Sequence, residues 1–232
     1  MRGPAAESRP VAVVAGVGEG LGAHLCRALV ARGHTVAALG RAVPATLANE
    51  PHIRSFTLNL ASREQVDAAF QEISASLGDV EVVVYNAHQL VIRPFGELRE
   101  ADLRRALDSG VVGAFHVAQC ALASMKRGTL IFTGATASLR GAARFSAFAA
   151  AKFAMRGMAQ SLAREYGPRG IHVAHVVIDG LIWCPQTIAR FDPEPERCLP
   201  PEAIVEAYLQ LVDQSPGAWT HELDLRPSTE AF

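Results

Sequence analysis

Four glycines at alternating positions, Gly16, Gly18, Gly20 and Gly22, follow a short apolar run and precede a stretch of helical spacing. In this arrangement Gly16 can take a tight turn, Gly20 lets a phosphate group approach the backbone, and Gly22 permits close packing of a helix on a strand. The helix N-terminus would present N–H groups and the positive end of its dipole to the phosphates. Any tight strand-to-helix turn favours glycine, but a position after the first strand favours dinucleotide binding.

The elements that must position this turn alternate between strand and helix along the whole chain. Short β-branched runs predict strands, and apolar residues at helical spacing predict helices. We expect strands at 11–15, 35–39, 53–58, 80–85, 129–133, 171–178 and 219–225, and helices at 21–31, 62–77, 100–125, 144–166 and 204–212. This order predicts one α/β domain over residues 1–232, a doubly wound parallel sheet (Rossmann fold) with right-handed crossovers.

In such a sheet, ligands bind beyond the carboxyl ends of the strands, so the loops that follow the strands should share one rim. Residues 1–9 are expected to form a flexible tail. Residues 183–201 are rich in proline and polar side chains, which predicts a mobile loop on the substrate side.

Composition limits the partners of the chain. Half of its 232 residues are apolar, 19% are charged, and 22 basic residues face 23 acidic ones, so we expect no nucleic-acid partner. No apolar run approaches the roughly 20 residues that cross a bilayer, and we expect a cytoplasmic protein without membrane association. The cysteines lie apart from one another and from histidine clusters, which predicts free thiols and no metal site (Cys26, Cys120, Cys184 and Cys198).

Five segments in fixed order resemble the landmarks of the short-chain dehydrogenase/reductase family. The glycine turn is similar to the family's GxxxGxG fingerprint, and the other landmarks follow along almost the whole chain. They are Tyr85-Asn86-Ala87, Gly113, Lys152 and Asp179-Gly180-Leu181-Ile182. The resemblance implies an oxidoreductase that uses a nicotinamide dinucleotide, and a homodimer or homotetramer built through the helices at 100–125 and 144–166.

The end of the second strand bears on the choice of cofactor. An acidic side chain there would bind the adenosine ribose and repel a 2′-phosphate, but the strand ends in Leu39-Gly40-Arg41. Arg41 could bind a 2′-phosphate, which favours NADP(H) over NAD(H), although a solvated surface arginine is the alternative interpretation. Glu19 opposes this preference, because many NADP(H)-binding members of the family carry a basic residue in the turn.

The resemblance also implies roles for further residues. Asn59 and Leu60 should border the adenine, Asn86 and Ala87 the adenosine side of the cofactor, and Ile182 the nicotinamide amide. The remaining cofactor contacts are expected from the turn and from the loop after the sixth strand (Gly16, Gly18, Glu19, Gly20, Leu21 and Gly180). His88 and Asp179 depart from the family pattern, which has glycine and proline there.

The family's catalytic side chains are largely replaced. Lys152 is retained, but the positions of the family's Tyr, Ser and Asn hold Phe148, Ala135 and Gly110. No tyrosine lies between Tyr85 and Tyr166, so the loss does not depend on the register. Because a general acid contributes about 10²–10⁴ in rate, ordinary alcohol and ketone chemistry should be severely impaired. Displaced hydroxyls could come from Thr133, Thr136, Ser138 or Ser146, which more often cap or form turns.

Two functions remain open at this point. One is an NADP(H)-dependent oxidoreductase with a degenerate catalytic set, acting on an unidentified small molecule. The other is an NADP(H)-binding pseudoenzyme with a regulatory or scaffold role. Lys152 would bind the nicotinamide ribose in both. A third possibility is that Glu19, His88 and Asp179 have abolished nucleotide binding, which would leave only a structural domain.

Overall fold

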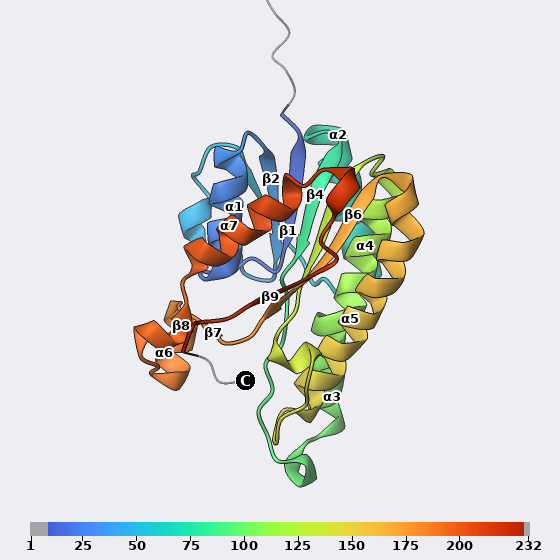
Figure 1. Ribbon diagram of the computed structural model, residues 1–232. Helices are drawn as coiled ribbons and strands as arrows, with labels where there is room; N and C mark the ends of the chain where they lie inside the picture. Colours follow the sequence, from blue (N-terminus) through green and yellow to red (C-terminus); the bar gives the residue numbers. More distant parts are fainter. Residues whose placement is uncertain (1–8, 230–232) are drawn as a thin grey trace, which may run out of the picture.

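The computed structural model describes residues 9–229. Seven parallel strands form the central sheet in the order β3-β2-β1-β4-β5-β6-β9 (Figure 1). The strands are β1 (Val11–Ala15), β2 (Thr35–Gly40), β3 (Ile53–Thr57), β4 (Val80–Tyr85), β5 (Gly128–Thr133), β6 (Ile171–Ile178) and β9 (Glu222–Leu225). The strand order reverses between β1 and β4, which confirms the doubly wound parallel sheet.

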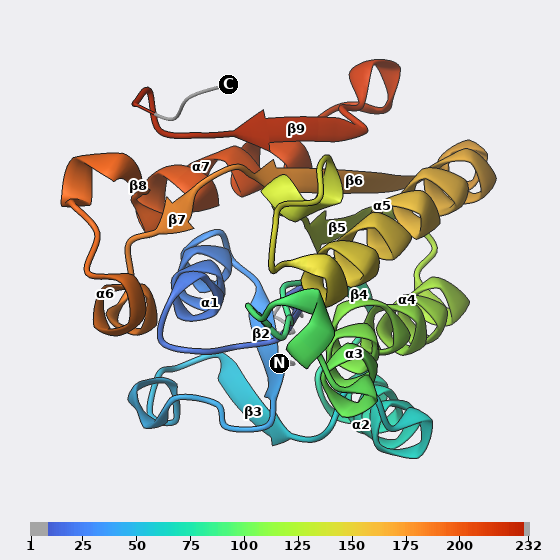
Figure 2. The same ribbon diagram turned by 90° about the horizontal axis from the view of Figure 1, so that it is seen from below.

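Helices cover both faces of the sheet, as Figure 2 shows in a view from below. One face carries α1 (Leu21–Ala31) and α7 (Pro201–Val212). The other carries α2 (Arg63–Ser76), α4 (Gly113–Ser124) and α5 (Ser146–Tyr166), with α3 (Glu100–Leu107) packed against α5.

Alternation along β1 divides the core between the two faces. Val11, Val13 and Ala15 belong to the cluster under α2, α4 and α5, whereas Ala12 and Val14 belong to the cluster under α1 and α7. All five are fully buried, because a parallel strand between two helical layers has no solvent face.

The predicted helix at 100–125 contains an irregularity. Residues Asp108–Val112 form a π-helical segment between α3 and α4. The hydroxyl of Tyr85 donates to the carbonyl oxygen of Ser109 at 2.6 Å, and a Cβ at Gly113 would lie 2.5 Å from that hydroxyl. The buried Tyr85 hydroxyl thus leaves no room for a side chain at Gly113, and it satisfies the carbonyl oxygen of Ser109 in the π-helical segment.

The same helical segment, Glu100–Ser124, is long and apolar enough to cross a membrane, which the sequence analysis did not anticipate. Its apolar composition has a structural cause, since Ala114, Val117, Ala118 and Ala121 of α4 pack against the sheet.

Two segments predicted to be flexible or mobile make defined contacts in the structure. Arg9, placed in the flexible tail, donates hydrogen bonds to the carbonyl oxygens of Val30 and Gly33, both at 2.9 Å; residues 1–8 lie outside the described residues. The segment 183–201 contains the short helix α6 (Pro185–Phe191) and the strand β8 (Cys198–Leu199), which pairs with β7 (Leu181–Ile182). The segment predicted to be a mobile loop therefore contains a short helix and a two-stranded sheet.

Candidate active site

A large cavity of about 1580 Å³ opens at the carboxyl ends of the strands. Every residue that the sequence analysis assigned to the cofactor lines it (Gly16, Gly18, Glu19, Gly20, Leu21, Arg41, Asn59, Leu60, Asn86, Ala87, Lys152, Gly180 and Ile182). Among the positions of the family's catalytic side chains, Ala135 and Phe148 line the cavity and Gly110 does not.

The glycine turn is shaped by close backbone contacts. Gly16 has φ +95°, and a Cβ there would lie 2.3 Å from the backbone nitrogen of Ala87. A Cβ at Gly22 would lie 2.8 Å from the Cα of Val17, so this glycine lets the first helical turn pack on the turn backbone. A side chain at either position would therefore displace backbone rather than a flexible neighbour.

The other two glycines face the cavity side. A Cβ at Gly18 would meet nothing within 4 Å, and one at Gly20 would lie 3.2 Å from the Cβ of Cys184. Gly20 caps α1 without a side-chain hydrogen bond, and the first turn of the helix carries no acidic residue. The open space at Gly18 and the uncapped helix start fit the phosphates of a dinucleotide.

Asn86 braces this turn from the neighbouring strand. Its backbone N–H donates to the carbonyl oxygen of Ala15 at 2.7 Å, and its side-chain amide donates to that of Gly16 at 3.0 Å. The adjacent Ala87 sets the close approach to Gly16. The Asn86-Ala87 pair therefore holds the glycine turn in place from β4.

At the adenosine end, Arg41 and Glu19 are both exposed on the cavity wall. Asn59 accepts a hydrogen bond on its side-chain oxygen from the Ala61 N–H at 3.1 Å and thereby shapes the loop after β3. Leu60 beside it is buried, and its carbonyl oxygen lies 3.2 Å from Nδ1 of His116.

Lys152 projects from α5 to the end of β5. Its ammonium donates to the carbonyl oxygen of Thr133 at 2.6 Å and lies 5.7 Å from the ring centroid of Phe148, one helical turn earlier. The side chain is 2% exposed, and burial lowers the pKa of Lys152 to about 7. The imidazole of His88 packs edge-on against the ring of Phe148, with 6.1 Å between the ring centroids.

Gly110 lies where helix α5 passes closest to the π-helical segment. A Cβ at Gly110 would come within 2.6 Å of the Cβ of Ala151. A larger side chain at this position therefore requires the two helices to shift apart.

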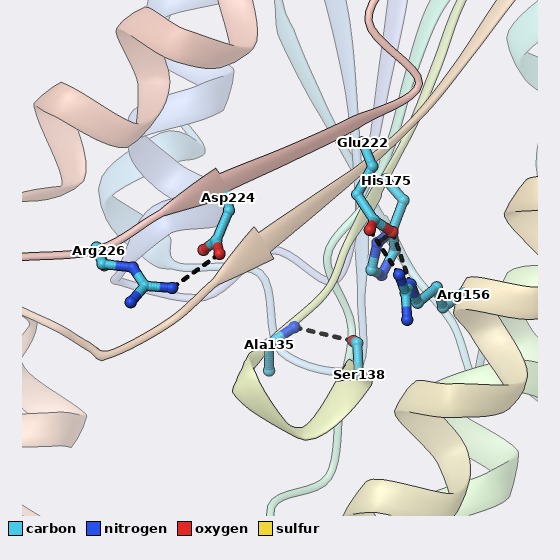
Figure 3. A network of polar contacts seen from close by, with 7 residues as sticks. All are labelled: Ala135, Ser138, Arg156, His175, Glu222, Asp224 and Arg226. Carbon is cyan, nitrogen blue, oxygen red and sulfur yellow. Dashed lines mark hydrogen bonds and ion pairs between the residues drawn. The ribbon is translucent and has the colours of Figure 1, made fainter. Parts of the chain in front are cut away.

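The hydroxyl groups of Thr133, Ser138, Tyr85 and Tyr208 take part in hydrogen bonds within the fold, whereas the buried Oγ of Ser146 has no hydrogen-bond partner among the described residues. Tyr208 donates to Thr133 Oγ1 at 2.9 Å from the opposite side of the sheet, and burial raises the pKa of both Tyr208 and Tyr85. Ser138 Oγ accepts from the backbone N–H of Ala135 at 3.1 Å and is fully buried (Figure 3). Thr133 lines the cavity, whereas Tyr85, Tyr208 and Ser138 do not.

Thr136 reaches the cavity wall, but its hydroxyl donates to the carboxylate of Asp179 at 2.5 Å. Asp179 is fully buried and pairs with Arg226, whose Nη2 lies 3.0 Å from Oδ2. Arg140 approaches the same carboxylate at 3.7 Å. The unusual acid after β6 thus joins the loop at Thr136 to the chain beyond β9.

A second polar cluster, which the sequence did not predict, joins α5 to strands β6 and β9 (Figure 3). Arg156 of α5 makes two hydrogen bonds of 2.7 Å to Glu222 of β9, and Nδ1 of His175 lies 3.2 Å from the same carboxylate. The paired arginine lowers the pKa of Glu222. A Cβ at Gly134 would lie 2.4 Å from Nε2 of His175. The cluster forms only when α5, β6 and β9 come together in the fold. The one feature of the sequence that could have indicated it is His175, a histidine within an apolar strand.

Comparison with known proteins agrees with this geometry. Residues 10–182 match the short chain dehydrogenase family. The chain is 33% identical over 186 residues to the 3-alpha-(or 20-beta)-hydroxysteroid dehydrogenase of Mycobacterium tuberculosis, covering 76% of this chain and 70% of that protein.

Solved structures share the whole fold. The short-chain dehydrogenase from Rhodopseudomonas palustris is 32% identical with a TM-score of 0.80, covering 94% of this chain and 98% of that one. The alcohol dehydrogenase from Thermococcus sibiricus, complexed with 5-hydroxy-NADP, has a TM-score of 0.84 at 22% identity, covering 96% of this chain and 98% of that one, and so shows a likeness of fold. The glycine turn, the doubly wound sheet and these matches together show that the chain belongs to the short-chain dehydrogenase/reductase family.

Proposed function

We propose that the protein is an NADP(H)-dependent oxidoreductase of small molecules with a degenerate catalytic set. The observation that carries the proposal is the cavity at the strand ends, whose lining includes the glycine turn, Arg41, Asn86 and Lys152. When bound there, a nicotinamide dinucleotide supplies a hydride. The turn and the start of α1 would hold its phosphates, and Lys152 its nicotinamide ribose.

Arg41 supports the choice of NADP(H). It stands directly after β2 on the cavity wall, where a guanidinium can make charge-assisted hydrogen bonds to a 2′-phosphate. Glu19 lies on the same wall and opposes the preference electrostatically. The archaeal alcohol dehydrogenase of the same fold, bound to 5-hydroxy-NADP, is in keeping with the choice.

The catalytic proposal is that hydride transfer operates without the family's hydroxyl donors. Phe148 and Ala135 line the cavity with side chains that hold no exchangeable proton, and Gly110 is confined by Ala151. We propose that the acceptor is an activated one, such as an enoyl group or a quinone-like ring, for which hydride transfer needs less acid assistance. Positioning of donor and acceptor would then supply most of the rate.

The test is a fluorescence titration with NADPH and with NADH. We expect micromolar binding of NADPH and at least tenfold weaker binding of NADH, the equivalent of about 1.4 kcal/mol. Arg41→Ala should remove this difference by weakening NADPH alone, whereas Arg127→Ala, at an exposed site outside the cavity, should leave both affinities unchanged. Absence of binding to either dinucleotide would end the proposal.

A pseudoenzyme is the second candidate, and the tight contact between Gly110 and Ala151 favours it, because the site of the family's Asn is filled by helix packing. The double substitution Phe148→Tyr and Ala135→Ser restores the other two side chains. If the double variant reduces ketones and the unmodified protein does not, the cavity still admits a substrate. A variant that binds NADPH and stays inactive on a broad panel would favour the regulatory role.

We further propose a homodimer or homotetramer built on α4 and α5, and a cytoplasmic location. Phe115 of α4 and Phe153 of α5 are 46% and 44% exposed, an arrangement typical of an interaction surface. The four cysteines are all free, in keeping with a reducing compartment.

A further inference from the structure

Lys152 is a buried amine on the wall of an accessible cavity. Its side chain is 2% exposed, yet it lines the 1580 Å³ cavity. Within residues 9–229, its one hydrogen-bond partner is the carbonyl oxygen of Thr133 at 2.6 Å, and no carboxylate forms an ion pair with it. A buried ammonium ion with only a neutral acceptor is costly, so this environment favours the uncharged amine.

The neighbouring side chains supply no compensating negative charge. The Phe148 ring lies 5.7 Å from the amine, and the two imidazoles close enough to interact with the Lys152 charge, His88 and His175, are neutral or positive. The acids nearby are engaged elsewhere, Glu222 by Arg156 and Asp179 by Arg226. The Tyr208 hydroxyl is committed to Thr133. Burial accordingly lowers the pKa of Lys152 to about 7.

We propose that Lys152 is a nucleophilic amine that condenses with an aldehyde or ketone admitted to the cavity. The Nζ lone pair forms a bond to the carbonyl carbon, and the carbonyl π electrons move to oxygen. The oxygen leaves as water with the two hydrogens of the amine, which yields an imine, and water reverses the reaction. No oxidant or reductant is consumed, so this reactivity does not depend on the proposed hydride transfer.

The walls next to the amine define the kind of carbonyl compound. A cluster of apolar side chains adjoins Lys152 on the cavity surface (Leu90, Ala135, Ala137, Phe145 and Phe148). Uncharged aromatic or aliphatic carbonyl compounds are therefore the class that fits. A charged substituent on this side would lose its hydration without gaining a partner.

The chain offers an unusually direct experiment, because Lys126 and Lys152 are its only lysines. The protein is incubated at pH 7 with benzaldehyde and sodium cyanoborohydride, which converts an imine into a stable secondary amine. Peptide mapping by mass spectrometry then gives the rate at each lysine and at the N-terminal amine. Lys126, 88% exposed, is the internal reference.

We expect labelling at Lys152 to be at least about tenfold faster than at Lys126. With a pKa of about 7, about half of the Lys152 amine is uncharged at pH 7, compared with about 0.04% for an ordinary lysine of pKa 10.4. The Lys152 rate should level off above about pH 8, whereas the rate at an exposed lysine keeps rising. Lys126→Arg should preserve the Lys152 label, and Lys152→Arg should remove it without changing Lys126.

Equal or slower labelling of Lys152 would overturn the proposal, provided that formaldehyde, a smaller probe, gives the same ranking. Cofactor binding is read separately in the same assay. NADPH should slow labelling at Lys152 and leave Lys126 unaffected. Absence of such protection would contradict the proposed cofactor site while leaving the reactivity of the amine established.

Discussion

Arg226 Nη2 lies 3.0 Å from Asp179 Oδ2, so the chain beyond the last strand is fastened to the loop that follows β6. The carboxylate also accepts the Thr136 hydroxyl at 2.5 Å. One buried acid thereby holds together two walls of the cavity and the end of β9, at a position where the family pattern has proline.

We expect Asp179→Ala to lower the free energy of unfolding by about 3 kcal/mol, because it removes the fully buried carboxylate that pairs with Arg226 and accepts the Thr136 hydroxyl. Chemical denaturation measures the change. Asp224→Ala removes a half-exposed partner 2.9 Å from the same arginine and should cost less than about 1 kcal/mol. Equal costs for the two variants would show that burial of Asp179 is not what matters.

Alanine substitutions at two glycines of the turn, Gly16 and Gly18, should have different effects on stability and on cofactor binding. Gly16→Ala combines a φ of +95° with a contact of 2.3 Å to backbone, and we expect a loss of several kcal/mol in stability. Gly18→Ala meets nothing within 4 Å, so its stability should stay within about 0.5 kcal/mol of the parent.

The Gly18→Ala methyl group enters the space proposed for the phosphates, and NADPH affinity should fall by at least about tenfold. Thermal unfolding and NADPH titration of both variants check the pair. A Gly18→Ala protein that binds NADPH like the parent would place the phosphates elsewhere.

Buried Lys152 should make stability depend on pH. Its pKa is about 7 in the folded protein and about 10.5 in the unfolded chain, so between these values the unfolded state binds more protons. Stability therefore rises with pH across this window, by up to about 1.4 kcal/mol per pH unit. Below about pH 7 the amine is protonated in both states, and the cost of burying its charge lowers the free energy of unfolding by a constant amount.

The substitution Lys152→Met should accordingly stabilise the protein at pH 7, and the gain should shrink as the pH approaches 10. Urea denaturation of parent and variant at pH 7, 8, 9 and 10 measures this difference. Lys126→Met, at an exposed site, is the matched control and should show no such trend. A gain that does not change with pH would mean that the folded-state pKa is not lowered.

The proposed assembly through α4 and α5 predicts a monomer after Phe115→Asp or Phe153→Asp, because a charge would be buried in the interface. Light scattering at micromolar concentration measures the mass. Phe95→Asp alters a phenylalanine that is 79% exposed on a separate short helical turn (Phe95–Glu97), and should leave the assembly intact. A parent protein that is already monomeric would contradict the assembly itself.

The sequence by itself determined the order of strands and helices, the glycine turn and the gathering of the cofactor residues at one rim. These features depend on local periodicity and on the rule that parallel strands share their carboxyl edge, which a single chain displays directly. Phe148 and Ala135 could be named by counting back from Lys152, and Gly110 by counting back from Gly113.

Only the tertiary structure decided which polar groups are satisfied, and by what. Arg226, which pairs with Asp179, and Arg156, which pairs with Glu222, both lie more than forty residues away from their partners along the chain, and no periodicity encodes such a meeting. The same holds for the π-helical segment, which depends on the hydroxyl of Tyr85, and for the pKa of Lys152. Desolvation is a property of the whole packed environment, so the reactivity of that amine follows from the fold and not from the lysine alone.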